Sequence, residues 1–525
     1  MQMDARCADG VYYNGRVVTF APGRKVVHAI AVADGRIIAV GSDAEIRRSA
    51  PRGSEKTDLG GKTVVPGFID SHTHFIQMGV DAMSVDLFDT KSMEEALGLL
   101  RTAANRRPDG EWVVGTNYRD NNWINGRFIT REDLDAYCPD HPTVVHRICG
   151  HLSSVNSKGI DAASITSDTP GAETDSSGEL TGIVTEAGVE VLRTMTAPNA
   201  REKTKGLRLA TKKAHSLGVT SIHDNGASGD FSIYREAERM NRLKVRVWFN
   251  TPSANLNSMT SLGMTSGVGS EVLKFGGVKI FCDGALGART AAVSEPFADD
   301  RTCRGVLIHS KEDMKEMTRE ANNAAIQLVI HAIGDVGIEV ALASIEDALR
   351  QNRRKNHRHR IEHLELPSQS HIRRMRRHGV IASMQPNFIG EWSGIDSMYV
   401  ERLGQKRASR NNPLREILDA KVKLAFGSDC MPLSPLYGIR SAVNATYPSQ
   451  RISVEEAFLS YTRDAAYASF EEDMKGTIAV GKLADFVVLS NDPFKERNAL
   501  GSIYVAKTVF GGEVVFDQAN LRKRK

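Results

Sequence analysis

Short apolar segments that end in polar or charged residues recur along this chain, separated by stretches with a helical pattern. This alternation is typical of strand–helix units that build a parallel sheet. Eight such units close into a barrel, and the 525 residues are too many for one small core. We therefore predict an α/β fold with a (β/α)8 TIM barrel. The candidate strands are residues 64–70, 112–116, 143–149, 219–224, 245–249, 278–283, 328–331, 360–363, 380–385 and 424–429.

The ten candidate strands exceed the eight that a barrel holds. A segment rich in Gly, Ser and Asp, residues 161–182, separates the second and third candidates from the later ones. We assign these two strands to an insertion after the first barrel strand, covering about residues 86–200. The barrel itself is predicted over residues 64–475.

Both ends of the chain alternate apolar and polar residues, as short antiparallel strands do. Because chain termini tend to lie close together at a domain surface, we predict that residues 1–63 and 476–525 form one small, discontinuous β-sandwich domain. The predicted strands are residues 11–14, 16–20, 28–32, 36–40, 476–481, 485–489, 507–510 and 513–516.

Composition narrows the partners that we expect. No apolar run approaches the roughly 20 residues of a membrane helix. Asp4 and Asp9 lie where a secretory signal would have an uninterrupted apolar stretch. The six cysteines lack CxxC spacing, which fits a reducing cytoplasm. The net charge is only +4, and the basic clusters lack a nucleic-acid reader motif. We expect a small-molecule substrate, no nucleic acid and no membrane, with a homodimer left open.

His72 and His74 directly follow the first predicted barrel strand. Residues two apart in an extended segment point to the same side, so both imidazoles can bind one metal ion at the strand's C-terminal end. Two surface histidines would give the same spacing by chance. The buried apolar strand that leads into the pair favours the metal site.

Further candidate ligands stand at the ends of later predicted strands, the end at which a barrel carries its chemistry. A lone histidine there is usually structural, and a lone buried lysine usually pairs with a carboxylate. The order of all of them along the chain indicates a shared site. These residues are Lys279, His331, His363 and Asp429.

This order, an HxH followed by Lys, His, His and Asp on strands one, four, five, six and eight, resembles the amidohydrolase superfamily. The segments VKIFCDGALGARTA, HAIGD, RIEHLE and GTIAVGKLADFVVLSNDP are similar to its amidohydrolase 3 branch. That branch includes N-substituted formamide deformylases and YtcJ-like metal-dependent hydrolases. The resemblance extends from about Gly10 to Phe516.

The resemblance implies a centre of two divalent metal ions, with zinc as the expected metal. A carbamate supplies two anionic oxygens to such ions, whereas a cationic lysine is a poor ligand beside them. An unmodified lysine in a site with one ion is the alternative. The implied ligands are His72, His74 and Asp429 for one ion, His331 and His363 for the second, and Lys279, carboxylated by CO2, as the bridge.

The resemblance also implies an activity, cleavage of a carbon–nitrogen bond other than a peptide bond. The expected substrate is an amide-like small molecule, such as an N-formyl or N-substituted amide. A hydroxide held between the ions would attack it, with Asp429 as the base that passes the proton to the leaving nitrogen. A deaminase on the same barrel is an alternative, although no HxxE pattern starts at His331. A non-catalytic barrel scaffold is another, but it would have lost ligands.

Three residues are predicted to contact the substrate. Arg289 lies in a loop after the strand that carries Lys279, and a structural salt bridge would explain it equally well. Trp123 and His151 lie in the insertion, which lines the substrate pocket in the related branch. Packing in a core is the alternative for Trp123.

Overall fold

The computed structural model describes residues 9–49, 51, 53–120, 123, 126–147, 151–495 and 497–522. The chain forms two compact units, one of Met1–Phe75 with Ala210–Lys525 and the other of Ile76–Leu209. The helices α2 (Phe75–Asp81) and α7 (Ala200–Ser216) carry the chain from one unit to the other. Each unit is described separately.

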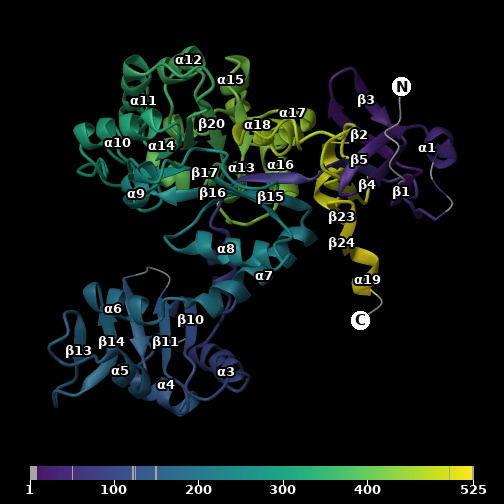
Figure 1. The fold of residues 1–525 in the computed structure, drawn as a ribbon. Helices are drawn as coiled ribbons and strands as arrows, with labels where there is room; N and C mark the ends of the chain where they lie inside the picture. Colours follow the sequence, from purple (N-terminus) through teal and green to yellow (C-terminus); the bar gives the residue numbers. More distant parts are fainter. Residues whose placement is uncertain are drawn as a thin grey trace. The chain divides into compact units, whose positions relative to one another are not determined.

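Eight strands form a parallel, nearly closed barrel in the first unit (Figure 1). They are β8 (Phe68–Thr73), β15 (Val219–Asn225), β16 (Arg246–Pro252), β17 (Leu273–Phe281), β18 (Gln327–Ala332), β19 (Arg360–His363), β20 (Ile381–Met384) and β21 (Leu424–Phe426). Neighbours in this order pair in parallel. The amide of Asp429 donates to the carbonyl of His72 (2.8 Å), which joins the ends of the first and last strands. The predicted (β/α)8 barrel is confirmed.

Helices with one apolar face follow most barrel strands. In α11 the buried residues Ile338, Ala341 and Ile345 recur at helical spacing. The side chain of Ser310 caps α10, and Gly379 ends α12 with a left-handed φ of 72°. Among the described residues, no helix combines the length and apolar character needed to cross a membrane. The helices are α8 (Asp230–Arg239), α9 (Leu256–Ser261), α10 (Lys311–Asn323), α11 (Asp335–Gln351), α12 (Gln369–His378), α13 (Pro386–Trp392), α14 (Met398–Ala408), α15 (Leu414–Asp419), α16 (Pro435–Val443), α17 (Val454–Ser460) and α18 (Arg463–Ala468).

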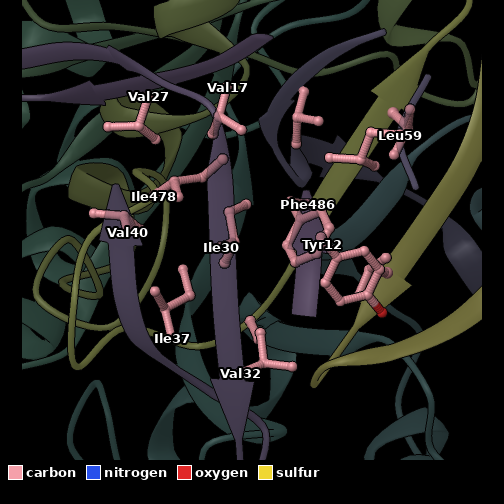
Figure 2. Close-up of a cluster of buried hydrophobic side chains, with 14 residues drawn as sticks. Tyr12, Val17, Val27, Ile30, Val32, Ile37, Val40, Leu59, Ile478 and Phe486 are labelled. Carbon is pink, nitrogen blue, oxygen red and sulfur yellow. The ribbon is translucent and has the colours of Figure 1, made fainter. Parts of the chain in front are cut away.

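The two chain ends build a β-sandwich in the same unit, as predicted. Its strands are β1 (Gly10–Tyr13), β2 (Arg16–Ala21), β3 (Arg24–Val27), β4 (Ala29–Ala33), β5 (Arg36–Gly41), β6 (Glu55–Asp58), β7 (Thr63–Pro66), β22 (Phe486–Leu489), β23 (Val505–Phe510) and β24 (Glu513–Asp517). One sheet has the order β5-β4-β1-β6, and the other β24-β23-β22-β7-β2-β3. Both sheets share one apolar core, in which Tyr12 meets the ring of Phe486 edge-on at 4.8 Å (Figure 2).

Two predicted strands differ from the structure. Residues 64–70 are divided at Gly67 into β7 of the sandwich and β8 of the barrel. Only glycine fits at this passage, because a Cβ on Gly67 would lie 2.2 Å from Oγ1 of Thr220. Residues 476–481 do not form a strand, since Gly476 and Gly481 have left-handed φ values of 86° and 89°. The apolar Ile478 between them nevertheless packs into the sandwich core.

The second unit is a six-stranded mixed sheet with helices, in the order β13-β14-β12-β11-β10-β9. The adjacent residues Val144 and Val145 belong to different apolar clusters, one on each face of the sheet. The predicted strands 112–116 and 143–149 belong here rather than to the barrel, although residues 148–149 lie outside the described chain. The elements are β9 (Val85–Asp86), β10 (Val113–Tyr118), β11 (Thr143–Arg147), β12 (Leu152–Val155), β13 (Ala172–Thr174), β14 (Leu180–Thr185), α3 (Met93–Ala104), α4 (Arg131–Tyr137), α5 (Ser157–Ala163) and α6 (Ala187–Met195).

Candidate metal centre

The predicted ligands lie toward the C-terminal ends of barrel strands, and parallel strands bring these ends to one rim. Strand β8 carries His72 and is followed by His74, β17 carries Lys279, β18 carries His331, β19 ends at His363, and Asp429 follows β21.

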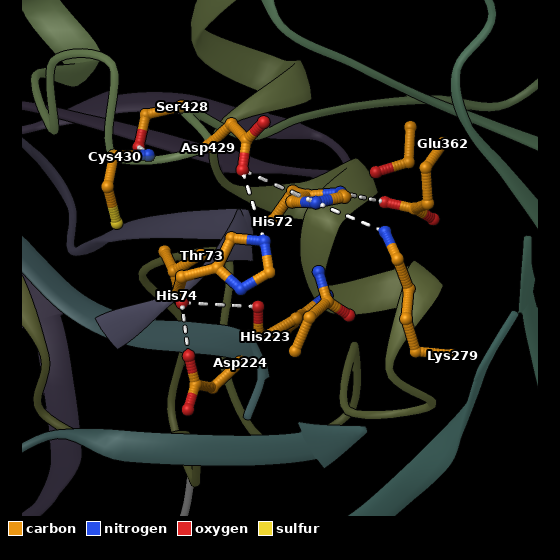
Figure 3. Close-up of polar contacts among 12 residues, drawn as sticks. His72, Thr73, His74, His223, Asp224, Lys279, Glu362, Ser428, Asp429 and Cys430 are labelled. Atoms are coloured by element: carbon orange, nitrogen blue, oxygen red, sulfur yellow. Dashed lines mark hydrogen bonds and ion pairs between the residues drawn. The ribbon is translucent and has the colours of Figure 1, made fainter. Parts of the chain in front are cut away.

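Three of these residues form a compact group of metal-ligand atoms (Figure 3). Oδ1 of Asp429 lies 3.6 Å from Nε2 of His72 and 3.4 Å from Nε2 of His74. One ligand atom from each residue lies within 4.8 Å of the other two. Two imidazoles and a carboxylate are donors that suit zinc and related metals. The backbone of Asp429 is left-handed (φ 54°), a conformation often found at binding sites. The group fits one divalent ion.

Lys279 approaches the imidazole of His72 from another strand, β17. Its Nζ lies 3.4 Å from Nε2 of His72, and the side chain is buried. Burial lowers the pKa of Lys279 to about 8, although Glu362 and Asp429 act in the opposite direction. The lysine nitrogen and the Asp429 carboxylate therefore converge on one nitrogen of His72.

His331 and His363 lie beside this group but do not belong to the compact trio. Their ring centroids are 4.4 Å apart, and the ring of His363 is 4.8 Å from that of His72. Nε2 of His331 donates to the carbonyl of Gly284 (3.0 Å), so Nδ1 is its nitrogen with a free lone pair. The buried Nδ1 of His363 has no hydrogen-bond partner. A buried nitrogen without a hydrogen-bond partner fits a position at which the nitrogen binds a metal ion.

The imidazoles of the site are held in the neutral form that binds metal. Burial, as the largest cause, lowers the pKa of His331 to about 3 and that of His74 to about 4. Burial likewise lowers the pKa of His72 and His363 well below the usual value. The pKa of Asp429 is raised to about 7 by burial, against the effect of the nearby Lys279.

Glu362 is a site residue that the sequence prediction missed. Its Oε2 accepts a hydrogen bond of 2.5 Å from Nδ1 of His72, and its Oε1 accepts one of 2.5 Å from Nε of Arg360. Burial, the largest single cause, would raise the pKa of Glu362, but the charge and hydrogen bond of Arg360 together with the charges of Lys279 and His363 lower it overall. The available sequence signal is spacing, because Arg360 and Glu362 are two apart in a buried strand, where charges need partners.

The backbone changes conformation at the end of β19, between Glu362 and His363. Adjacent residues of a regular strand point to opposite sides, yet both Glu362 and His363 contact or lie beside His72. His363 and Leu364 have left-handed φ values of 69° and 51°. The chain therefore leaves the strand geometry at His363, which is what brings two consecutive side chains to one site.

Two buried carboxylates hold the backbone around the histidine pair. Asp70 accepts from the amides of Ser428 (2.8 Å) and His72 (3.2 Å), and Asp224 accepts from the amide of Phe75 (2.6 Å). Burial raises the pKa of both Asp70 and Asp224 to about 7. These contacts fix the path of the chain on both sides of the HxH segment.

The structure gives each of the three residues predicted to contact the substrate a different environment. Arg289 forms an ion pair of 2.7 Å with Asp299 in a partly exposed loop. Trp123 is buried in the second unit, where it stacks on Tyr118 with centroids 5.6 Å apart. His151 is exposed in that same unit. Contact of these residues with a substrate stays a prediction.

Comparisons with known proteins cover nearly the whole chain. Residues 55–516 match the model of the amidohydrolase family. YtcJ of Bacillus subtilis (strain 168) is 30% identical over 97% of this chain and 99% of its own length. N-substituted formamide deformylase of Arthrobacter pascens is 27% identical over 97% and 98%. The crystal structure of an uncharacterized metal-dependent hydrolase from Pyrococcus furiosus has a TM-score of 0.80 at 32% identity, covering 93% of this chain and 100% of that one.

Proposed function

This chain belongs to the amidohydrolase family, among metal-dependent hydrolases, and we propose that it hydrolyses the C–N bond of an amide-like small molecule. The observation that carries the proposal is the group of His72, His74 and Asp429 at the rim of the barrel. N-formyl and other N-substituted amides are the proposed substrates, since the relative from Arthrobacter pascens is named for N-substituted formamides.

We assign the ligands of two divalent ions, with zinc as the proposed metal. When bound, the ions supply a Lewis acid that polarises the substrate carbonyl and makes water acidic near neutral pH. Support comes from the close trio of donors, the unpartnered Nδ1 of His363 and the free lone pair of His331. The assignment is His72, His74 and Asp429 for one ion, His331 and His363 for the other, and Lys279 between them.

Lys279 is proposed to carry a carboxyl group. Its neutral amine would attack the carbon of CO2 and lose one proton to water, which leaves a carbamate whose two oxygens share one negative charge. The position of Nζ, 3.4 Å from Nε2 of His72, supports the proposal, because an ammonium group at this distance would repel a cation on the same imidazole. An unmodified Lys279 beside a single ion is the alternative.

Asp429 is proposed as the proton carrier of the reaction. Its side chain is 17% exposed, so the carboxylate can meet a water molecule and a substrate at the rim. We assign to it the removal of a proton from the attacking water and the transfer of that proton to the departing nitrogen. The departing amine leaves neutral as a result.

The test compares wild type with Asp429→Asn after loading with zinc, on a panel of N-formyl and other N-substituted amides. We expect amine and carboxylate release from wild type only, with nearly equal zinc contents. A fully active D429N would contradict the role of Asp429. Ammonia release from an amidine or a ring substrate would favour the deaminase alternative, and a wild type that takes up no zinc would favour the scaffold. Carbon-13 spectra after labelling with bicarbonate test the carbamate.

A further inference from the structure

A chain of three buried side chains crosses the interior of the barrel beneath the metal centre. Arg360 donates to Glu362, and Glu362 accepts from Nδ1 of His72, with hydrogen bonds of 2.5 Å in both cases. The side chains of Arg360 and Glu362 are 0% exposed and that of His72 is 1% exposed. Strand β19 pairs with β18 and β20, whereas β8 pairs with β15. The contact therefore reaches across the barrel instead of joining neighbouring strands.

Arg360 is fixed from several directions, so it holds Glu362 in one place. Its Nη1 lies 2.8 Å from Nδ1 of His223, and its Nη2 lies 3.1 Å from Oγ of Ser383 and 2.9 Å from Oε2 of Glu362. Nη2 also donates to the carbonyl of Ser71, which directly precedes His72. A guanidinium has donors only, in a rigid planar fork, so Arg360 held by these partners presents its donors to Glu362 in one orientation.

An ionised carboxylate accepts hydrogen bonds and does not donate them. Nδ1 of His72 must therefore carry the hydrogen, and Nε2 must carry the lone pair. That nitrogen faces Oδ1 of Asp429 at 3.6 Å and Nζ of Lys279 at 3.4 Å. We propose that Arg360 and Glu362 are a positioning pair that sets the tautomer and ring orientation of His72 so that Nε2 binds the metal. This inference rests on the proposed function, because it requires a metal ion at the trio.

The test is the variant Glu362→Gln, measured by metal affinity in competition with a chelator. The amide nitrogen would face a donor of Arg360 or of His72, so at least one hydrogen bond of the three-residue chain is lost and the His72 ring is held less firmly. We expect zinc affinity to fall about 10- to 100-fold, the usual cost of losing a partner of a ligating histidine. We also expect a changed visible spectrum of the cobalt-loaded protein.

Asp485→Asn is the matched control. Asp485 is the carboxylate of another buried arginine pair, bound to Arg246 by hydrogen bonds of 2.5 and 3.0 Å, and it contacts none of the ligands in the described structure. This variant should leave zinc affinity and the cobalt spectrum unchanged. If E362Q does not fold, Glu362→Asp keeps the charge beside Arg360 but withdraws the carboxylate from His72, and the same loss of affinity is expected.

A double-variant measurement separates positioning from general damage. If Glu362 acts through His72, the change Glu362→Gln should have no further effect on metal binding once His72→Ala is present. Equal losses with and without His72 would overturn the inference, as would wild-type affinity in E362Q. A wild-type protein that binds no divalent ion would overturn the proposed function together with this inference, whereas binding by wild type and E362Q alike overturns the inference alone.

Discussion

Two groups of buried or partly buried ionisable side chains lie in the same unit of the protein and differ in how they are paired. The first, the seam cluster, consists of Arg246, Asp485, Lys475 and Glu471 and lies where the barrel meets the sandwich. Arg246 makes two hydrogen bonds, of 2.5 and 3.0 Å, to Asp485, and Lys475 lies 2.7 Å from Glu471. Opposite charges in this cluster are in direct contact.

The second group, the metal-site cluster, consists of His72, His74, Lys279 and Asp429. Its members approach one another only to between 3.4 and 3.6 Å. Because buried charges and lone pairs without close partners cost free energy, such an arrangement is stable only when something else satisfies them. The comparison indicates that spacing, and not burial or charge alone, separates a candidate metal-binding group from one that supports the fold.

The largest expected effect is on function and comes from Lys279→Met. Removing the proposed bridge should lower turnover about a thousandfold, or roughly 4 kcal/mol, and should halve the zinc content. The stability of the metal-free protein should be unchanged or higher, because a buried charge is replaced by an apolar chain of similar length. Turnover, elemental analysis and urea unfolding check these outcomes. A large loss of stability would remove the distinction between the two clusters.

Asp485→Asn should have the opposite effects, a loss of stability with unchanged turnover. Breaking the pair with Arg246 leaves a buried guanidinium short of its partner, so we expect a loss of about 3 kcal/mol in the free energy of unfolding. The new amide can still accept from the amide of Gly511, now 2.8 Å from Oδ1 of Asp485, which keeps the loss at the lower end of the usual range. Turnover of the folded protein should match wild type. Reduced metal content in this variant would contradict the expectation.

Metal removal sharpens the comparison further. With each ion at about 100 times its dissociation constant, chelation should lower the free energy of unfolding by about 2.7 kcal/mol per bound ion, because the ions bind the folded state alone. Asp485→Asn should cost the same with and without metal, since the two clusters share no partner in the described contacts. Denaturant titrations of wild type and D485N, each with and without metal, provide the measurement. A different loss of stability from the substitution in the two conditions would show coupling between the clusters.

The smallest effect is expected from Arg289→Ala. Arg289 is 36% exposed and pairs with Asp299, so the loss of stability should stay below about 1 kcal/mol. If Arg289 contacts the substrate as predicted, KM should rise while kcat stays near wild type. An unchanged KM would contradict the predicted substrate contact and leave the ion pair with Asp299 as the role of Arg289.

Several strand ends of the barrel could be predicted from sequence because a polar residue of recognisable chemistry lies at or just after the end of the strand. Lys279, His331 and Asp429 were found in this way. Glu362 was not, since its importance depends on a contact across the barrel with His72, and no local pattern encodes which strands face each other. The same limit applies to the spacing inside the metal-site cluster.

Local backbone explains the two strands that were predicted wrongly. The run 64–70 has no polar side chain before Asp70, and the change of sheet at Gly67 lies beside a close approach by Thr220, which is distant in sequence. Residues 476–481 carry the apolar pattern of a strand, but the two flanking glycines bend the chain in a way that no ladder of hydrogen bonds accommodates.

The passage through Gly67 ties the completion of the sheet before His72 to the order of protein synthesis. Strand β7 lies between β2 and β22, and one residue later the chain becomes β8 with its histidines. Since β22 leaves the ribosome long after β2 and β7, the segment before His72 lacks one of its two neighbouring strands until translation is almost over. A nascent chain that stalls before β22 therefore holds the strand that leads into His72 and His74 on an unfinished sheet.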